Sequence, residues 1–156
     1  MSPELDDKLV QKYPKIFADR HGSPQSTAMC WGFECDDGWY WLIDNMCNHI
    51  QKYIDLNKVP QVIATQVKQK FGTLRFYYTG GDEKIHGIVS HTEWLSGTIC
   101  EECGTHEHVG TTIGWNVTLC KTHWLITNYR YWKDTDGVCW ETNIDGSVVI
   151  VDEDKI

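Results

Sequence analysis

The chain has 156 residues, of which 41% are hydrophobic and 12% are aromatic. This composition is typical of a globular protein and excludes a disordered or low-complexity chain. The formal net charge of −8 disfavours binding to double-stranded nucleic acid, because an acidic surface repels phosphate backbones.

The length, the first residues and the cysteines indicate where the protein works. A chain of this length suits one domain over residues 1–156 with a core of its own. Residues 1–7 contain neither a basic segment nor an apolar run, so we expect no secretory signal and no membrane-spanning helix. The seven cysteines fit a reducing compartment, in which they serve as metal ligands or buried thiols. We therefore expect a cytoplasmic protein without a membrane partner.

Three helices are expected in the first two thirds of the chain. Ser2-Pro3 is a favourable helix start, and apolar residues at helical spacing follow until Pro14. After a loop and a turn-rich stretch, a second helix is expected over about residues 39–57, because its apolar residues form one face. Asp82 can cap a third helix, which ends at Gly97.

A β-hairpin is expected between the second and third helices. Residues 62–70 and 74–79 flank Gly72-Thr73, and glycine at the first central position is typical of a type II′ turn. This register places Lys70 opposite Arg75 on the face that also carries Lys68 and Tyr77. Like charges directly opposite each other destabilise a strand pair unless an anionic group lies between them.

The basic hairpin face is therefore a candidate binding surface, formed by Lys68, Lys70, Arg75 and Tyr77. Its cations can hold the carboxylates of a partner protein or a phosphate of a nucleotide. The alternative is that an acidic residue of a neighbouring helix neutralises them inside the fold.

A metal site is indicated by Cys100-Glu-Glu-Cys103 and, further on, Cys120-Lys-Thr-His123. Three thiolates and an imidazole at this spacing form the closed ligand set of a structural zinc ion. Gly104 supplies the backbone freedom that a knuckle between two cysteines requires. His106 and His108 are alternative ligands, and a bland alternative is that the cysteines are buried thiols.

The order of elements around these ligands is typical of a treble-clef zinc finger over residues 98–132. A strand over residues 115–119 leads to Cys120, and a helix is expected over about residues 121–132. Because Cys120 and His123 are three residues apart, they share one face of the first helical turn.

Residues 138–143 and 147–151 flank Asp145-Gly146 and predict a C-terminal hairpin. Its last strand, Val148 to Val151, is continuously apolar, so we expect the domain or a second copy of the chain to cover it. The predicted fold is α+β, with three helices on a small antiparallel sheet, an inserted treble-clef-like zinc finger and this hairpin. A homodimer through the hairpin is an open alternative.

No catalytic motif is present. The sequence lacks a Gly-x-Ser-x-Gly elbow, a phosphate-binding Walker loop and a His-Glu-x-x-His zinc motif. A closed set of three cysteines and one histidine also leaves no coordination position for a reactive water. Cys30, Cys35 and Cys47 are irregularly spaced for a second metal and are better interpreted as core thiols. We therefore expect a protein that is not an enzyme.

Four motifs follow one another in a distinctive order: Gly38-Trp39-Tyr-Trp-Leu42-Ile43, then Gln66-Val-Lys-Gln-Lys-Phe-Gly-Thr-Leu-Arg-Phe-Tyr-Tyr-Thr-Gly-Gly-Asp82, then Cys100-Glu-Glu-Cys-Gly104, then Gly114-Trp115 to Cys120 with His123. Over roughly residues 14–125 this order resembles a family of small tailed-phage and prophage proteins that has no established activity. The resemblance implies a phage-encoded protein made inside a bacterium, and it transfers no catalytic residue.

Two functions follow from these observations. The first is a non-enzymatic phage accessory protein with structural zinc that binds a host protein, such as a component of defence or gene expression, in the cytoplasm of the infected bacterium. The alternative is a small-ligand binder that sequesters a nucleotide-type signal in a pocket of aromatic and basic residues.

Overall fold

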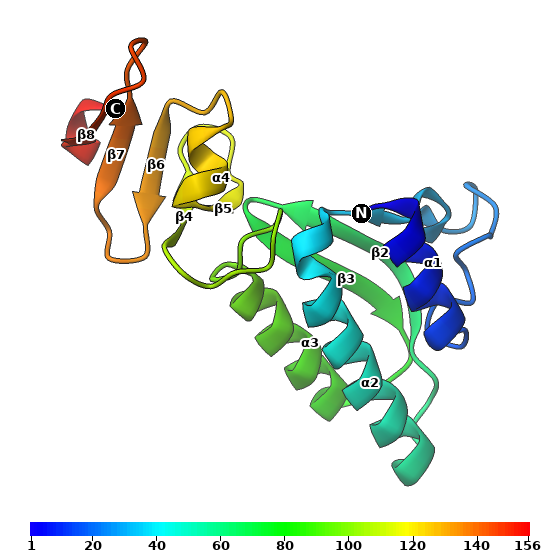
Figure 1. Cartoon of the computed structure of the whole chain (residues 1–156). Coiled ribbons are helices and arrows are strands. Elements are labelled where there is room, and N and C mark those ends of the chain that lie inside the picture. The colour runs from blue at the N-terminus through cyan, green and yellow to red at the C-terminus, as the bar shows by residue number, and fades with distance from the viewer.

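Buried side chains form two separate clusters in the computed structural model, which describes residues 1–156. The larger cluster has 20 residues from three helices and a three-stranded sheet, and the smaller has 6 residues in and around a five-stranded sheet. We call residues 1–99 the first lobe and residues 100–156 the second lobe, and Figure 1 shows them next to each other. The predicted α+β class is confirmed, and a single domain over residues 1–156 stays a prediction.

The first lobe contains the three predicted helices: α1 (Pro3–Lys12), α2 (Tyr40–Asn57) and α3 (Glu83–Ser96). Asp82 caps α3 as expected, since its Oδ1 accepts a hydrogen bond from the Ile85 N–H at 3.0 Å. Helices α2 and α3 run side by side in Figure 1 and contact each other. None of the helices combines the length and the apolar character that a membrane span requires. Two short 3₁₀ helices lie between α1 and α2, at Ala28–Trp31 and Asp37–Trp39.

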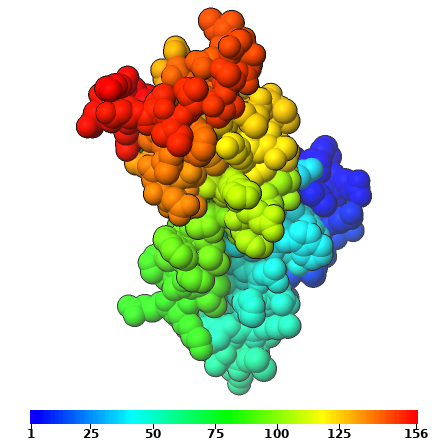
Figure 2. All heavy atoms as spheres, turned by 60° about the vertical axis from the view of Figure 1, so that its left-hand side comes forward, coloured from blue at the N-terminus to red at the C-terminus, as the bar shows by residue number.

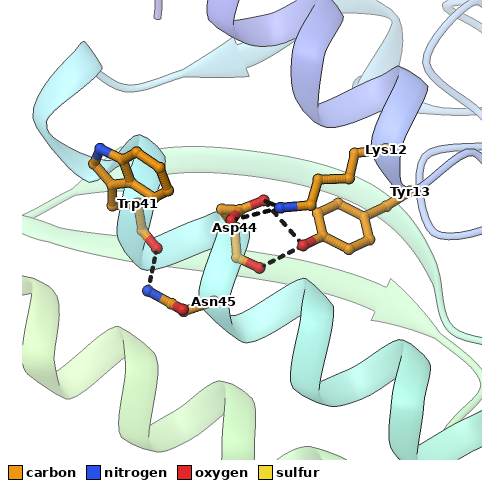
Figure 3. Close-up of polar contacts among 5 residues, drawn as sticks. All are labelled: Lys12, Tyr13, Trp41, Asp44 and Asn45. Carbon is orange, nitrogen blue, oxygen red and sulfur yellow. Dashed lines mark hydrogen bonds and ion pairs between the residues drawn. The ribbon is translucent and has the colours of Figure 1, made fainter.

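A buried carboxylate joins α1 to α2 (Figure 3). The side chain of Asp44 in α2 accepts hydrogen bonds from Lys12 Nζ at 2.8 Å and from the Tyr13 hydroxyl at 2.9 Å. One residue further along α2, Asn45 Nδ2 donates to the Trp41 carbonyl at 2.9 Å. Lys12 and Tyr13 thus supply the partners without which a buried charge would be strongly destabilising.

We expect Tyr13→Phe to lower the free energy of unfolding by about 1–2 kcal/mol near neutral pH, because a buried hydrogen bond is lost. Burial, followed by the hydrogen bond to Asp44, raises the pKa of Tyr13 to about 12. The pKa of an unfolded tyrosine is about 10, so this contribution is complete below about pH 10 and is lost as the pH rises toward 12.

The stability difference between wild type and Tyr13→Phe should therefore shrink over this pH range in chemical denaturation. Tyr40→Phe is the control, because the Tyr40 hydroxyl makes no hydrogen bond. A difference that stays constant with pH would contradict the described environment of Tyr13.

The first sheet has the order β1-β2-β3, and its hairpin turn differs from the predicted one. Strands β2 (Ile63–Lys70) and β3 (Thr73–Thr79) are joined by Phe71-Gly72, whose φ angles are 54° and 77°. Positive φ at both central residues is the type I′ turn, which favours glycine at its second position. The predicted type II′ turn is therefore wrong, and the pairing is shifted by two residues, so that Lys68 and not Lys70 is opposite Arg75.

The turn-rich stretch before α2 also contains a strand that the sequence did not predict. Strand β1 (Phe33–Glu34) pairs in parallel with β2 and places Glu34 beside Lys68. A strand of two residues is too short to show a hydrophobic alternation, so it forms only because β2 is already in place.

The other edge of this sheet is covered by α3. Ser96 Oγ accepts a hydrogen bond from the Leu74 N–H, and Glu93 Oε1 accepts one from the Phe76 N–H, both at 2.8 Å. These two bonds satisfy backbone groups of β3 that would otherwise be an open sheet edge.

The second lobe is built on an antiparallel sheet of order β5-β4-β6-β7-β8. The predicted helix over residues 121–132 is wrong, because the helix ends at Leu125 and the chain then forms a strand. Trp132 decides this: its buried ring stacks on Trp124 at 5.3 Å and its Nε1 donates to the Leu119 carbonyl at 3.1 Å. The elements are β4 (Val109–Thr112), β5 (Thr118–Cys120), α4 (Lys121–Leu125), β6 (Tyr131–Asp134), β7 (Cys139–Thr142), β8 (Val148–Val151) and a 3₁₀ helix, Glu153–Lys155.

The C-terminal hairpin is present, with β7 and β8 paired around Asp145-Gly146. It extends the second-lobe sheet through β6, and Figure 2 shows it at the opposite end of the molecule from α2. Strand β8 is the outer edge of the sheet, and Ile150 is 65% exposed. Val148 packs against the second buried cluster, but Val149 and Ile150 are exposed, so the predicted cover of this strand by the domain is only partial. Cover of the exposed side by a second copy stays a prediction.

Candidate metal centre

Four side chains from three elements of the second lobe meet at one point. Cys100 and Cys103 belong to the turn after α3, residues 100–104, which we call the knuckle. Cys120 ends β5, and His123 lies in α4. One ligand atom from each residue lies within 4.8 Å of all the others. His123 Nδ1 lies 3.1 Å from the Cys120 sulfur and 3.6 Å from the Cys100 sulfur. The cysteine and histidine spacing predicted this convergence, and the group can hold a metal ion.

Backbone N–H groups of the knuckle are directed at the Cys100 sulfur. The Cys100 carbonyl accepts a hydrogen bond from the Gly104 N–H at 2.8 Å, and Gly104 has φ of 75°, which favours glycine. Burial raises the pKa of the Cys100 thiol to about 12, while the backbone N–H groups of Cys120, Cys103 and Glu102 oppose this rise. N–H groups directed at a sulfur stabilise its thiolate, which is the form that binds a metal.

Cys120 is in a different electrostatic environment. Burial is the largest single effect and acts to raise its pKa, but hydrogen bonds from the backbone and ring of His123, together with those from Cys100 and Cys103, lower the pKa below its ordinary value. The thiolate is the metal-binding form of cysteine, so a cation bound by these sulfurs would replace the thiol protons.

The knuckle is packed closely on the first lobe. The Gly38 N–H donates to the Glu101 carbonyl at 2.7 Å, and the Asp36 N–H donates to Glu101 Oε1 at 3.2 Å. A Cβ atom at Gly38 would lie within 2.5 Å of three backbone atoms of the knuckle, so only glycine allows this approach. The candidate metal centre therefore lies at the junction of the two lobes.

No protein-family model, curated protein or solved structure matches this chain. Three sulfurs and one nitrogen are soft ligands, and they fill the four positions of a tetrahedral ion.

The basic hairpin face lies on the side of β2 and β3 opposite the core residues Val67 and Phe76. Lys68, Lys70 and Arg75 form no ion pair with any carboxylate. The neutralising acidic residue that the sequence left open is thus not found as an ion pair, although β1 places Glu34 next to Lys68.

The basic side chains instead contact their own hairpin. Arg75 Nη1 donates to Thr73 Oγ1 at 2.5 Å and to the Leu74 carbonyl at 2.8 Å. Lys68 Nζ lies 5.9 Å from the centre of the exposed Tyr77 ring, and Lys70 Nζ lies 5.2 Å from that of the exposed Phe71 ring. The exposed Phe71 ring is thus a further aromatic group beside Lys70. The predicted register instead pairs Phe71 with Leu74 within the two strands.

Two other sequence-based alternatives find no support in the geometry. His106 and His108 are exposed and lie outside the converging group. Cys35 and Cys47 are buried in the first-lobe core, as expected for core thiols, whereas Cys30 is only half-buried and lies outside this core. Sequence reasoning missed Gly38 and Glu101, because a glycine in a turn and a glutamate beside a cysteine give no signal of burial at an interface.

Proposed function

We propose that Cys100, Cys103, Cys120 and His123 bind one zinc ion in a treble-clef-like finger. A tetrahedral zinc ion, with bonds of about 2.3 Å to sulfur and 2.0 Å to nitrogen, places neighbouring ligand atoms roughly 3.5–3.8 Å apart. The 3.6 Å between His123 Nδ1 and the Cys100 sulfur agrees with this edge, and the Cys120 contact has to open by about half an ångström. The knuckle, the β4–β5 hairpin and the ligand pair at the start of α4 follow one another in treble-clef order.

The proposed zinc is structural and the protein is not an enzyme. The ion supplies cross-linking between three elements, and its four protein ligands leave no position for substrate. Only 6 residues form the second buried cluster, two of which are the ligands Cys100 and Cys120. A core of this size depends on a metal for its stability.

We further propose that the protein is a phage accessory protein that binds a host protein in the cytoplasm of the infected bacterium. The resemblance of its motif order to small tailed-phage and prophage proteins supports this origin. The observation that carries the binding role is the basic hairpin face, whose cations remain without ion pairs in a chain of net charge −8. Such a face fits an acidic patch on a partner.

The shape of this face favours a protein over a nucleotide. Lys70, Arg75 and Tyr77 line none of the five principal pockets, so they lie on open sheet surface. A small ligand usually requires a concave site that buries most of its surface, whereas a protein partner binds across an open one. Binding of a nucleotide is therefore the alternative result that the following experiment has to distinguish from binding of a protein.

Changing Lys70 and Arg75 together to glutamine should abolish capture of the host partner from bacterial lysate. The melting temperature should stay close to that of the wild type, because loss of the Arg75 hydrogen bonds is offset by removal of the repulsion between Arg75 and Lys68. Lys52→Gln with Lys58→Gln is the charge-matched control, since both lysines are exposed on or just after α2 and lack ion pairs.

Retention of the captured protein by the hairpin variant would contradict the proposal. So would a thermal shift of the wild type with nucleotides that the hairpin variant loses, because this result would support a nucleotide binder.

A further inference from the structure

An acidic cleft of about 390 Å³ lies between the first-lobe sheet and the second lobe. Its walls come from β1, β2, the knuckle and the segments around β5 and α4. Four carboxylates line it: Glu34, Asp36, Glu101 and Glu102. It lies next to the basic hairpin face, since Lys68 lines both.

Glu101 is the unusual member of this group, because it is 3% exposed and only half satisfied. Its Oε1 accepts a hydrogen bond from the Asp36 N–H at 3.2 Å, while its Oε2 is buried and has no hydrogen-bond partner. A buried carboxylate oxygen without a partner is rare in folded proteins and indicates a missing donor.

The cleft contains no internal cation that supplies this donor. None of the four carboxylates forms an ion pair. Lys68 is the one cationic side chain in the lining, and it lies against the Tyr77 ring. The ammonium group of Met1 donates to the carbonyl groups of Phe33 and Cys35. The exposed carboxylates of Glu34, Asp36 and Glu102 therefore give the cleft an excess of negative charge that an external cation can neutralise.

The geometry distinguishes between kinds of cation. The Cys100, Cys103, Cys120 and His123 set is the one group of acidic, cysteine or histidine side chains close enough to share a metal ion. No three of the cleft carboxylates therefore converge closely enough to share a compact metal ion. A guanidinium group is planar, carries five N–H donors and can bridge several carboxylates. It also stacks on aromatic rings, and the cleft offers Tyr129 and Trp115, which is 71% exposed.

We propose that this cleft binds the guanidinium group of an arginine side chain on a partner protein. This inference rests on the proposed function, because it assumes that the partner is a protein. One partner segment then presents acidic residues to Lys70 and Arg75 and an arginine to the cleft. Gln69 Nε2 donates to the Asn116 carbonyl at 2.7 Å, which fixes the hairpin to the wall that carries Trp115.

The test uses a short peptide amide, acetyl-Gly-Arg-Gly, and the same peptide with citrulline, which keeps the shape and lacks the charge. Titration of the full-length protein is followed by NMR at the indole N–H of Trp115. The arginine peptide should shift this signal in a saturable manner, and the citrulline peptide should not. Equal shifts with both peptides, or no shift with either, would overturn the inference.

Variants of the cleft residues test whether the arginine peptide binds in the cleft. Glu101→Gln should weaken binding of the arginine peptide roughly tenfold, since a charge-assisted hydrogen bond is lost. Asp36→Asn with Glu102→Gln changes exposed residues whose side chains form no hydrogen bond or ion pair, so it decides the question if Glu101→Gln fails to fold. Glu107→Gln is the control, because Glu107 is exposed and does not line the cleft. Wild-type affinity in the Asp36 and Glu102 double variant would overturn the assignment.

A third probe separates the sources of the guanidinium group. Propylguanidine carries it as a free small molecule with the same single charge as the peptide, and tighter binding of propylguanidine than of the peptide would overturn the assignment to a partner protein. Failure of the peptide titration leaves the capture experiment with the hairpin variant unaffected, so the two proposals fail independently.

Discussion

Replacing Cys103 by serine should release the proposed zinc and unfold the half of the second lobe that would bind it, namely β4, β5 and α4. A serine hydroxyl is a poor zinc ligand, and apparent binding energies of structural zinc are about 10–16 kcal/mol in small fingers. Without the ion, the small second cluster has to hold Trp124 and Trp132 by packing alone. The first lobe keeps its own core of 20 residues and should stay folded.

This result can be measured as loss of the near-ultraviolet circular dichroism of the stacked tryptophans together with loss of bound metal. Cys103 is the most informative ligand to change, because it is exposed and its replacement leaves no cavity in the core. Cys30→Ser is the matched control, since Cys30 lies outside the cluster. A Cys103→Ser protein that keeps its metal and its tryptophan signal would show that Cys103 is not a ligand.

Gly38→Ala should destabilise the protein by about 3 kcal/mol and loosen the contact between the lobes. The added Cβ atom would lie within 2.5 Å of the carbonyl oxygens of Cys100 and Glu101 and of the Gly104 nitrogen. All three are backbone atoms, so the clash cannot be relieved by a side-chain rotation and the knuckle has to move. The hydrogen bond from the Gly38 N–H to the Glu101 carbonyl would be lost with it.

The metal should remain bound in Gly38→Ala, because all four ligands lie on the second-lobe side of this contact. Gly87→Ala is a sharp control: Gly87 lies in α3 with no atom within 4 Å of an added Cβ, so alanine should stabilise the helix by about 0.5–1 kcal/mol. Chemical denaturation of both variants measures the two effects. Equal stability of the two variants would contradict the described packing of the knuckle on the 3₁₀ helix Asp37–Trp39.

Elements with local signals were predictable from the sequence. The ends of α1, α2 and α3 follow from Pro3, from one apolar face and from the Asp82 cap, which act within a few residues. The zinc-type ligand set was predictable for the same reason, because ligand spacing is itself local information.

Features that depend on distant contacts were not predictable. Either turn, at Phe71-Gly72 or at Gly72-Thr73, keeps the same residues on the core face of β2 and β3, so hydrophobic alternation cannot choose between them. The helical periodicity after Lys121 ends at Leu125 because Trp132 packs on Trp124, a contact that no local pattern reveals. The acidic cleft combines segments from residue 34 to residue 129, so its carboxylates give no common signal in the chain.

Elemental analysis of the protein purified without added metal tests the central claim most directly. We expect about one zinc per chain, because three thiolates and one imidazole converge within 4.8 Å at the junction of the lobes. A zinc content near zero in protein that is fully folded would contradict the proposed structural finger and the role we assign to it.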